Sequence, residues 1–165
     1  MRTIKLCITL GLLSSMSAFA SGSHPVTFQN NANDTQLSVN YITGHKYSKC
    51  VSYVRPHTLN INPQDAELSI FMDKDSRTCN SANKRASWVL KTADGSSTIL
   101  TFKHEPVQDG RAYTTYNDII VVDGNKIAET DILNDFSTDF PVSYNFGSHY
   151  RLVFDSFRKV RLVSR

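Results

Sequence analysis

The chain has 165 residues, of which 40% are hydrophobic and 20% are charged, and its formal net charge is +3 at pH 7. This length suits one domain with a real core, and the apolar residues spread along the whole chain exclude an intrinsically disordered protein. Two basic residues belong to a predicted targeting signal, and without them the net charge falls to +1. Such a near-neutral chain gives no reason to expect nucleic-acid binding, which needs a concentrated cationic surface.

Residues 1–20 have the three parts of a secretory signal peptide. Arg2 and Lys5 precede an apolar run, residues 6–13, and small residues lead to a cleavage site after Ala20. A membrane-spanning helix needs about 18 apolar residues, and serines interrupt this run too early. No second run of spanning length follows. We therefore predict a periplasmic or secreted protein, with residues 21–165 forming a single domain and no transmembrane segment after cleavage.

The mature chain alternates apolar and polar residues with a period of two, and turn-forming residues recur every eight to twelve positions. This pattern predicts an all-β fold, an antiparallel β-sandwich with immunoglobulin-like or jelly-roll-like layering. Asp94-Gly95 and Asp123-Gly124 each predict a tight hairpin turn. The expected strands are 26–30, 36–42, 50–55, 57–61, 67–73, 87–93, 97–104, 112–116, 118–122, 126–132 and 149–157, and the basic C-terminal tail has the pattern of a last strand.

Alternation within these strands predicts the core. The residues expected to point inward are Val26, Phe28, Leu37, Val39, Leu59, Ile61, Leu68, Ile70, Trp88, Leu90, Ile99, Leu100, Phe102, Ile119, Val121, Leu152 and Phe154. Helical periodicity is weak, and a short helical turn is possible only within 128–136. Trp88 follows both mature cysteines, whereas the tryptophan of an immunoglobulin domain lies between its two cysteines. The sequence therefore predicts a sandwich without assigning it to a family.

The mature chain contains two cysteines, Cys50 and Cys79. Cys50 ends the stretch GHKYSKC, whose histidine and lysines would also favour a reactive thiolate. An even pair in an exported chain predicts a disulfide, because thiols are normally oxidised outside the cytoplasm. A redox-active pair, a metal ligand and a nucleophile are the alternatives.

The sequence has no catalytic or cofactor-binding motif and no zinc-ligand spacing. The histidines lie far apart, and a hydrolase that pairs His104 or His149 with a carboxylate from 105–139 is one hypothesis. That segment carries a net charge of −6, which is compatible with calcium, although a solvated acidic face is the favoured interpretation. We therefore predict no cofactor and no metal site.

Two groups of residues are candidates for binding. Tyrosine suits recognition surfaces, because its ring adds contact area at a low entropic cost. The candidate ligand-binding residues are Tyr113, Tyr116, Tyr144 and Tyr150. Residues 151–165 carry a net charge of +4, which suits contact with an anionic surface. The candidates for this contact are Arg158, Lys159, Arg161 and Arg165.

These observations favour a binding module for an envelope or extracellular ligand, which would be a glycan, a lipid headgroup or a protein. One alternative is an envelope assembly subunit or folding partner that uses an exposed strand edge. The other is the small hydrolase described above. We expect a monomer or a weak oligomer, and a binding role is favoured over an enzymatic one.

Overall fold

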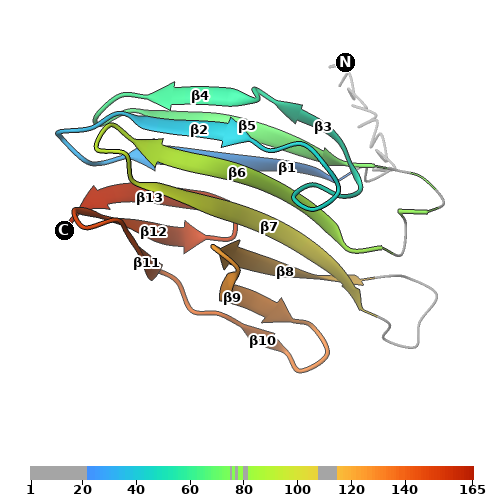
Figure 1. The fold of residues 1–165 in the computed structure, drawn as a ribbon. Helices are drawn as coiled ribbons and strands as arrows, with labels where there is room; N and C mark the ends of the chain where they lie inside the picture. Colours follow the sequence, from blue (N-terminus) through green and yellow to red (C-terminus); the bar gives the residue numbers. More distant parts are fainter. Residues whose placement is uncertain (1–21, 75, 77, 80–81, 108–114) are drawn as a thin grey trace, which may run out of the picture.

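Two β-sheets packed face to face make up the structure (Figure 1). The structure is a computed structural model, and it describes residues 22–74, 76, 78–79, 82–107 and 115–165. The predicted signal peptide and Tyr113 lie outside these ranges. The described residues form strands and turns without a helix. The predicted all-β sandwich is therefore confirmed.

The first sheet has six strands and joins the two ends of the described chain. Its order is β11 (Val142–Phe146), β12 (Tyr150–Ser156), β13 (Lys159–Ser164), β1 (Ser23–Asn30), β5 (Ala66–Asp73) and β3 (Val51–Arg55). β1 and β13 are paired in parallel, whereas the other neighbours are antiparallel. Figure 1 shows that β1 starts at the end of the sandwich opposite the C-terminus.

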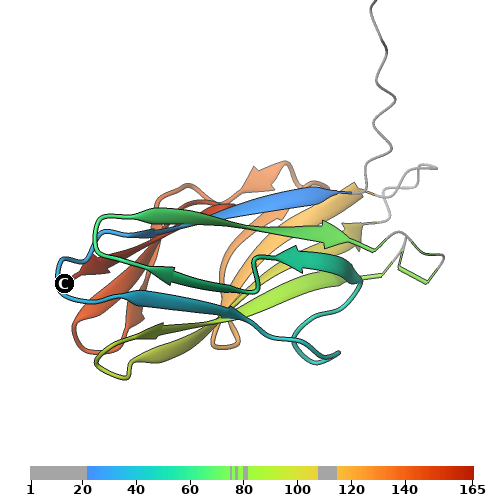
Figure 2. The same ribbon diagram turned by 90° about the horizontal axis from the view of Figure 1, so that it is seen from above.

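The second sheet has seven strands. Its order is β10 (Phe136–Ser137), β9 (Asn125–Asp131), β8 (Thr115–Val122), β7 (Ser97–Val107), β6 (Lys84–Thr92), β2 (Leu37–Tyr41) and β4 (Thr58–Ile61). Figure 2, in which the molecule is turned by 90°, shows that its strands run along the same long axis as those of the first sheet. The predicted Asp-Gly turns join β6 to β7 and β8 to β9. Gly95 and Gly124 have φ angles of 87° and 86° there, which glycine adopts without strain.

Trp88 lies at the centre of the core. Its ring contacts Phe102 from its own sheet at 5.8 Å, and Phe28 and Phe71 from the opposite sheet at 5.8 and 5.9 Å between ring centroids. All three contacts are edge to face, which is a preferred geometry for aromatic pairs. This cluster therefore joins the two sheets.

The predicted orientation of β5 is wrong. Leu68 was expected to point inward but is 43% exposed, while Ser69 and Phe71 are fully buried. The pairing with β1 explains this, because Val26 lies opposite Ser69 and points into the core. The Ser69 hydroxyl donates to the Pro56 carbonyl at 3.1 Å, so its burial leaves no unsatisfied hydrogen bond.

The predicted face of β8 is also wrong, because Ile120 and Val122 belong to the core in place of Ile119 and Val121, and Ile99 of β7 likewise lies outside the core. Other local predictions differ as well. Residues 115–122 form one strand, where a break was expected after 116. β11 was not predicted as a strand. The possible helical turn within 128–136 is instead the end of β9, a tight turn and β10.

Candidate functional site

The predicted tyrosines do not form one surface. Tyr150 is only 4% exposed and belongs to the core. Tyr144 is half-buried, and its hydroxyl lies 3.4 Å from the Asp123 carboxylate. Tyr116 is also half-buried, and its ring lies under the Lys84 ammonium at 4.7 Å. Of the described three, none presents a freely exposed ring.

The predicted basic residues of the C-terminal tail also do not form one exposed surface. Arg161 forms a bidentate ion pair with Asp155, at 2.7 Å for both contacts, and these bonds hold the pKa of Asp155 below its ordinary value. Lys159 lies 3.5 Å from the same carboxylate. Arg158 is half-buried in an internal cluster described below, and Arg165 is exposed. The tail therefore presents fewer free charges than its sequence suggests.

The predicted disulfide is present. Cys50 and Cys79 are bonded, with their Cα atoms 5.5 Å apart. The bond fixes the end of the loop 42–49, which contains most of the GHKYSKC stretch. The same loop is bonded to the start of β6, because Lys49 and Arg85 exchange two backbone hydrogen bonds of 3.0 Å. The thiol of Cys50 is therefore consumed, and the stretch serves as the wall of a surface groove.

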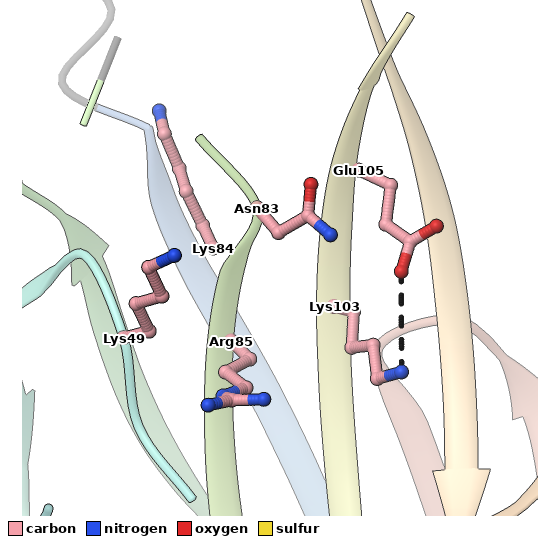
Figure 3. A pocket seen from close by; sticks show the side chains of 6 residues that line it. All are labelled: Lys49, Asn83, Lys84, Arg85, Lys103 and Glu105. Atoms are coloured by element: carbon pink, nitrogen blue, oxygen red, sulfur yellow. Dashed lines mark ion pairs between the residues drawn. The ribbon is translucent and has the colours of Figure 1, made fainter. Parts of the chain in front are cut away.

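Three cations lie in register across this part of the seven-stranded sheet. Lys49 pairs with Arg85 in an antiparallel bridge, and Arg85 pairs with Lys103 of β7. Directly opposed residues of antiparallel strands point to the same face, and the next residues along, Ala86 and Phe102, point into the core. The cationic row, Lys49–Arg85–Lys103, therefore lies on the outer face of the sheet, as Figure 3 shows.

Two cavities meet at this row and share Arg85 and Lys103. The smaller has a volume of about 120 Å³ and lies near the start of β6 (Figure 3). The larger, about 360 Å³, extends along β6 and β7. Its lining residues are Lys46, Tyr47, Arg85, Ser87, Ile99, Thr101, Lys103, Val121, Asp123 and Gly124. We call the two cavities together the groove.

The cations of the groove have few acidic partners. Lys103 lies 3.9 Å from Glu105, and both side chains are about one-third exposed, so solvent weakens this pair. Asp123 is occupied by hydrogen bonds from Thr98 and the Ile99 amide. The Arg85 guanidinium donates to the His45 carbonyl. Among the described residues, no carboxylate lies within ion-pair distance of Lys46, Lys49 or Arg85.

A second cluster of ionisable groups lies between the two sheets. His24, Asp73 and Arg158 come from the six-stranded sheet and its turns, and Lys84, His104 and Asp118 come from the seven-stranded sheet. The Arg158 Nη2 lies 3.1 Å from His24 Nδ1 and 2.8 Å from His104 Nε2. A guanidinium only donates hydrogen bonds, so each contact is a hydrogen bond in the tautomer whose ring nitrogen accepts.

Carboxylates complete this inter-sheet cluster. Asp73 accepts a hydrogen bond of 3.0 Å from Lys84 and lies 3.3 Å from His24. Burial raises the pKa of Asp73, but the His24 and Lys84 contacts outweigh it, and the net shift is downward. The Asp118 Oδ1 lies 3.2 Å from His104 Nε2 and 3.5 Å from Arg158.

Burial dominates the titration of His104. It lowers the pKa of His104 to about 4, and Asp118 opposes this shift only in part. His104 is therefore neutral near pH 7, and its Nε2 lone pair is occupied by Arg158. The hydrolase hypothesis paired His104 with an acid from 105–139, and Asp118 is such an acid. However, a pKa of about 4 makes His104 a weak base near pH 7. His149 is exposed and lies at the opposite end of β12 from this cluster.

Compared with known proteins, the chain matches no family model, no curated sequence and no solved structure. Within the described ranges, no three His, Cys, Asp or Glu residues are grouped so as to hold a metal ion. None of the described residues belongs to a helix long and apolar enough to cross a membrane. The groove and the inter-sheet cluster are thus the two features of the described structure that could support a function.

The sequence contains a signal for the groove, but only in combination with strand register. Lys49, Arg85 and Lys103 are far apart in the chain and are three ordinary surface cations when taken singly. Only the pairing of β6 with β7 and with the loop 42–49 brings them into one row. Sequence reasoning instead selected the C-terminal cations, which are close together in sequence.

Proposed function

We propose that the protein is an exported binding module that holds an anionic ligand in the groove. The observation that carries this proposal is the cationic row. Like charges directly opposite one another on neighbouring strands destabilise a sheet. Two such pairs in one row, Lys49 with Arg85 and Arg85 with Lys103, oppose folding. A bound anion would remove this repulsion.

The ligand should carry two or more phosphate, sulfate or carboxylate groups. Neighbouring strands lie roughly 4.8 Å apart, so the row offers positive charge at intervals of about this length. The larger cavity, about 360 Å³, lies within the range of small-molecule sites, roughly 300–1,000 Å³. Ile99 and Val121 give it an apolar floor. Acidic glycans and the headgroups of anionic lipids both have this chemistry.

A disulfide supports an oxidising compartment as the site of action. Ligands of this kind occur in bacterial envelopes and on cell surfaces, so the proposed location and the proposed ligand agree. The strand-edge alternative has less support. The four edge strands of the described sheets are β3, β4, β10 and β11, and none is longer than five residues.

Isothermal titration calorimetry tests the proposal with two probes, a heparin oligosaccharide and vesicles of phosphatidylglycerol in phosphatidylcholine. Neutral dextran and pure phosphatidylcholine vesicles are the controls. We expect binding to at least one anionic probe, and weaker binding at high salt because exposed charges are screened. The probe that binds distinguishes a glycan from a lipid headgroup.

Arg85→Gln and Lys103→Gln should each weaken this binding about tenfold, which corresponds to about 1.4 kcal/mol. The matched control is Lys91→Gln, because Lys91 is an exposed cation on the same strand as Arg85 but lies outside the lining of both cavities. The control should bind as the wild type does. Equal weakening in all three variants would point to a general charge effect and contradict a site in the groove.

A further inference from the structure

Three large apolar side chains are held in solvent at the turn between β9 and β10. Ile132, Leu133 and Phe136 are 47%, 59% and 51% exposed. Among the described residues, only two other large hydrophobic side chains are exposed to a comparable degree. Single exposed apolar residues are ordinary, whereas large exposed apolar patches mark interaction sites, and these three residues lie within five positions of one another.

This turn is held in one conformation. The Asp131 carboxylate accepts hydrogen bonds from the backbone amides of Leu133 and Asn134, at 3.2 and 3.3 Å, and from the Asn134 side chain at 2.7 Å. The Ile132 amide donates to Asn117 of β8 at 3.0 Å. The backbone of the turn therefore needs little further ordering when the apolar residues are bound.

The charge around these side chains is negative. We call residues 131–139 the knob. Besides Asp131, the knob contains Asp135 and Asp139, which form no ion pair with any residue that the structure describes. No lysine or arginine occurs between Lys126 and Arg151. The knob therefore suits a partner with an apolar floor and a cationic rim, and an anionic membrane would repel it.

The groove has this complementary chemistry. Tyr47, Ile99 and Val121 line its larger cavity, and Lys46, Arg85 and Lys103 supply positive charge around them. The hydrogen bond to Asn117 fixes the knob beside the start of β8 in its own molecule. We propose that the knob of one copy docks in the groove of a second copy. This inference rests on the groove being the anion site of the proposed function.

The contact would join two different surfaces, so it is heterologous and leaves a free knob at one end and a free groove at the other. Copies therefore add head to tail, and assemblies grow with concentration. Because the knob is small, the interface belongs to the class below about 1,200 Å² in total, which is typical of weak and transient association. An anionic ligand competes for the groove and should separate the copies.

Sedimentation velocity over a range of protein concentrations tests this inference on the protein purified after export, with its disulfide formed. We expect the average mass to rise with concentration and to fall on addition of salt or of the anionic probe that binds the groove. Leu133→Asp in the knob and Arg85→Gln in the groove should each weaken association at least tenfold. Leu68→Asp is the matched control, because Leu68 is an exposed leucine on the other sheet, and it should associate as the wild type does.

Mixing two defective variants gives a sharper test. The Leu133→Asp protein keeps its groove and the Arg85→Gln protein keeps its knob, so their mixture should form pairs but no longer assemblies. A wild-type protein that stays monomeric overturns the inference, as does association that survives Leu133→Asp. Loss of vesicle binding in the Leu133→Asp protein, without self-association of the wild type, would make the knob a membrane contact and would also overturn it. The proposed function fails separately, if neither anionic probe binds.

Discussion

Arg158 links the two histidines of the inter-sheet cluster. Its guanidinium faces His24 and His104, and both rings accept its hydrogen bonds. Protonation of His104 would place a second positive charge against the Arg158 guanidinium, which stays protonated. Asp73 pairs with Lys84 and Asp118 pairs with Arg158, so no unpaired carboxylate of the cluster would compensate the added charge. The cluster therefore joins the two sheets in a pH-dependent way.

We predict that acid destabilises the protein partly through His104. The pKa of this ring is about 4 in the folded protein and about 6.5 when unfolded. Between these values the unfolded chain binds more protons, so stability is present above about pH 6.5 and is lost as the pH falls to about 4. The expected loss is on the order of 3 kcal/mol. Urea unfolding at several pH values measures it.

The comparison that isolates His104 is a pair of variants. His104→Asn should flatten the dependence of the unfolding free energy on pH between about 6.5 and 4. His45→Asn is the control substitution, because His45 is exposed in the loop 42–49 and lies outside the inter-sheet cluster. If His104→Asn leaves the slope unchanged, His104 is not the group that titrates.

Among the elements, β5 illustrates where sequence reasoning succeeds and fails. The strand itself was predicted within one residue, because its β-rich composition is a local property. The prediction of which face points inward was wrong. Leu68 and Ile70 make one face of the strand apolar, whereas the other face has Phe71 but also the polar Ser69, so the sequence alone favoured the wrong face. Pairing with β1 determines which face of β5 is buried. This pairing joins residues far apart in the sequence, so the residues of β5 alone do not reveal it.

Truncation at the two faces of β5 should have very different effects. Phe71→Ala removes a fully buried ring that contacts Trp88 and should destabilise the protein by about 3–5 kcal/mol. Leu68→Ala removes an exposed side chain and should change stability by less than about 0.5 kcal/mol. Thermal or urea unfolding measures both, and a costly Leu68→Ala substitution would contradict the orientation described here.

The Cys50–Cys79 bond lies directly after the loop 42–49. The bond joins residues 29 apart. In the chain-entropy account, a bond that closes a loop of this length stabilises the folded protein by about 3–4 kcal/mol. We predict that Cys50→Ser with Cys79→Ser lowers the melting temperature and weakens binding of the anionic probe. Binding is measured at a temperature where the variant remains folded. Unchanged binding there would mean that the loop forms the groove wall without the bond.

At the scale of the whole molecule, the fold class, the disulfide and the two Asp-Gly turns were predicted, because each follows from composition or from adjacent residues. Most of the predicted core is buried for the same reason. The candidate site was not predicted. Its row of cations depends on which strands become neighbours, and the inter-sheet cluster depends on how the sheets stack. The four C-terminal cations were chosen for their proximity in sequence, and the structure pairs two of them with Asp155.

The parallel pairing of β1 with β13 has a consequence for biogenesis. The first strand of the described chain has the last one as a neighbour, and β13 also separates β1 from β12. The six-stranded sheet therefore has a gap at its centre until β13 is in place. Contacts between such distant parts of a chain form slowly, so this sheet should be completed late in folding. If the chain is exported as we propose, this late completion would keep it unfolded while it is threaded across the membrane.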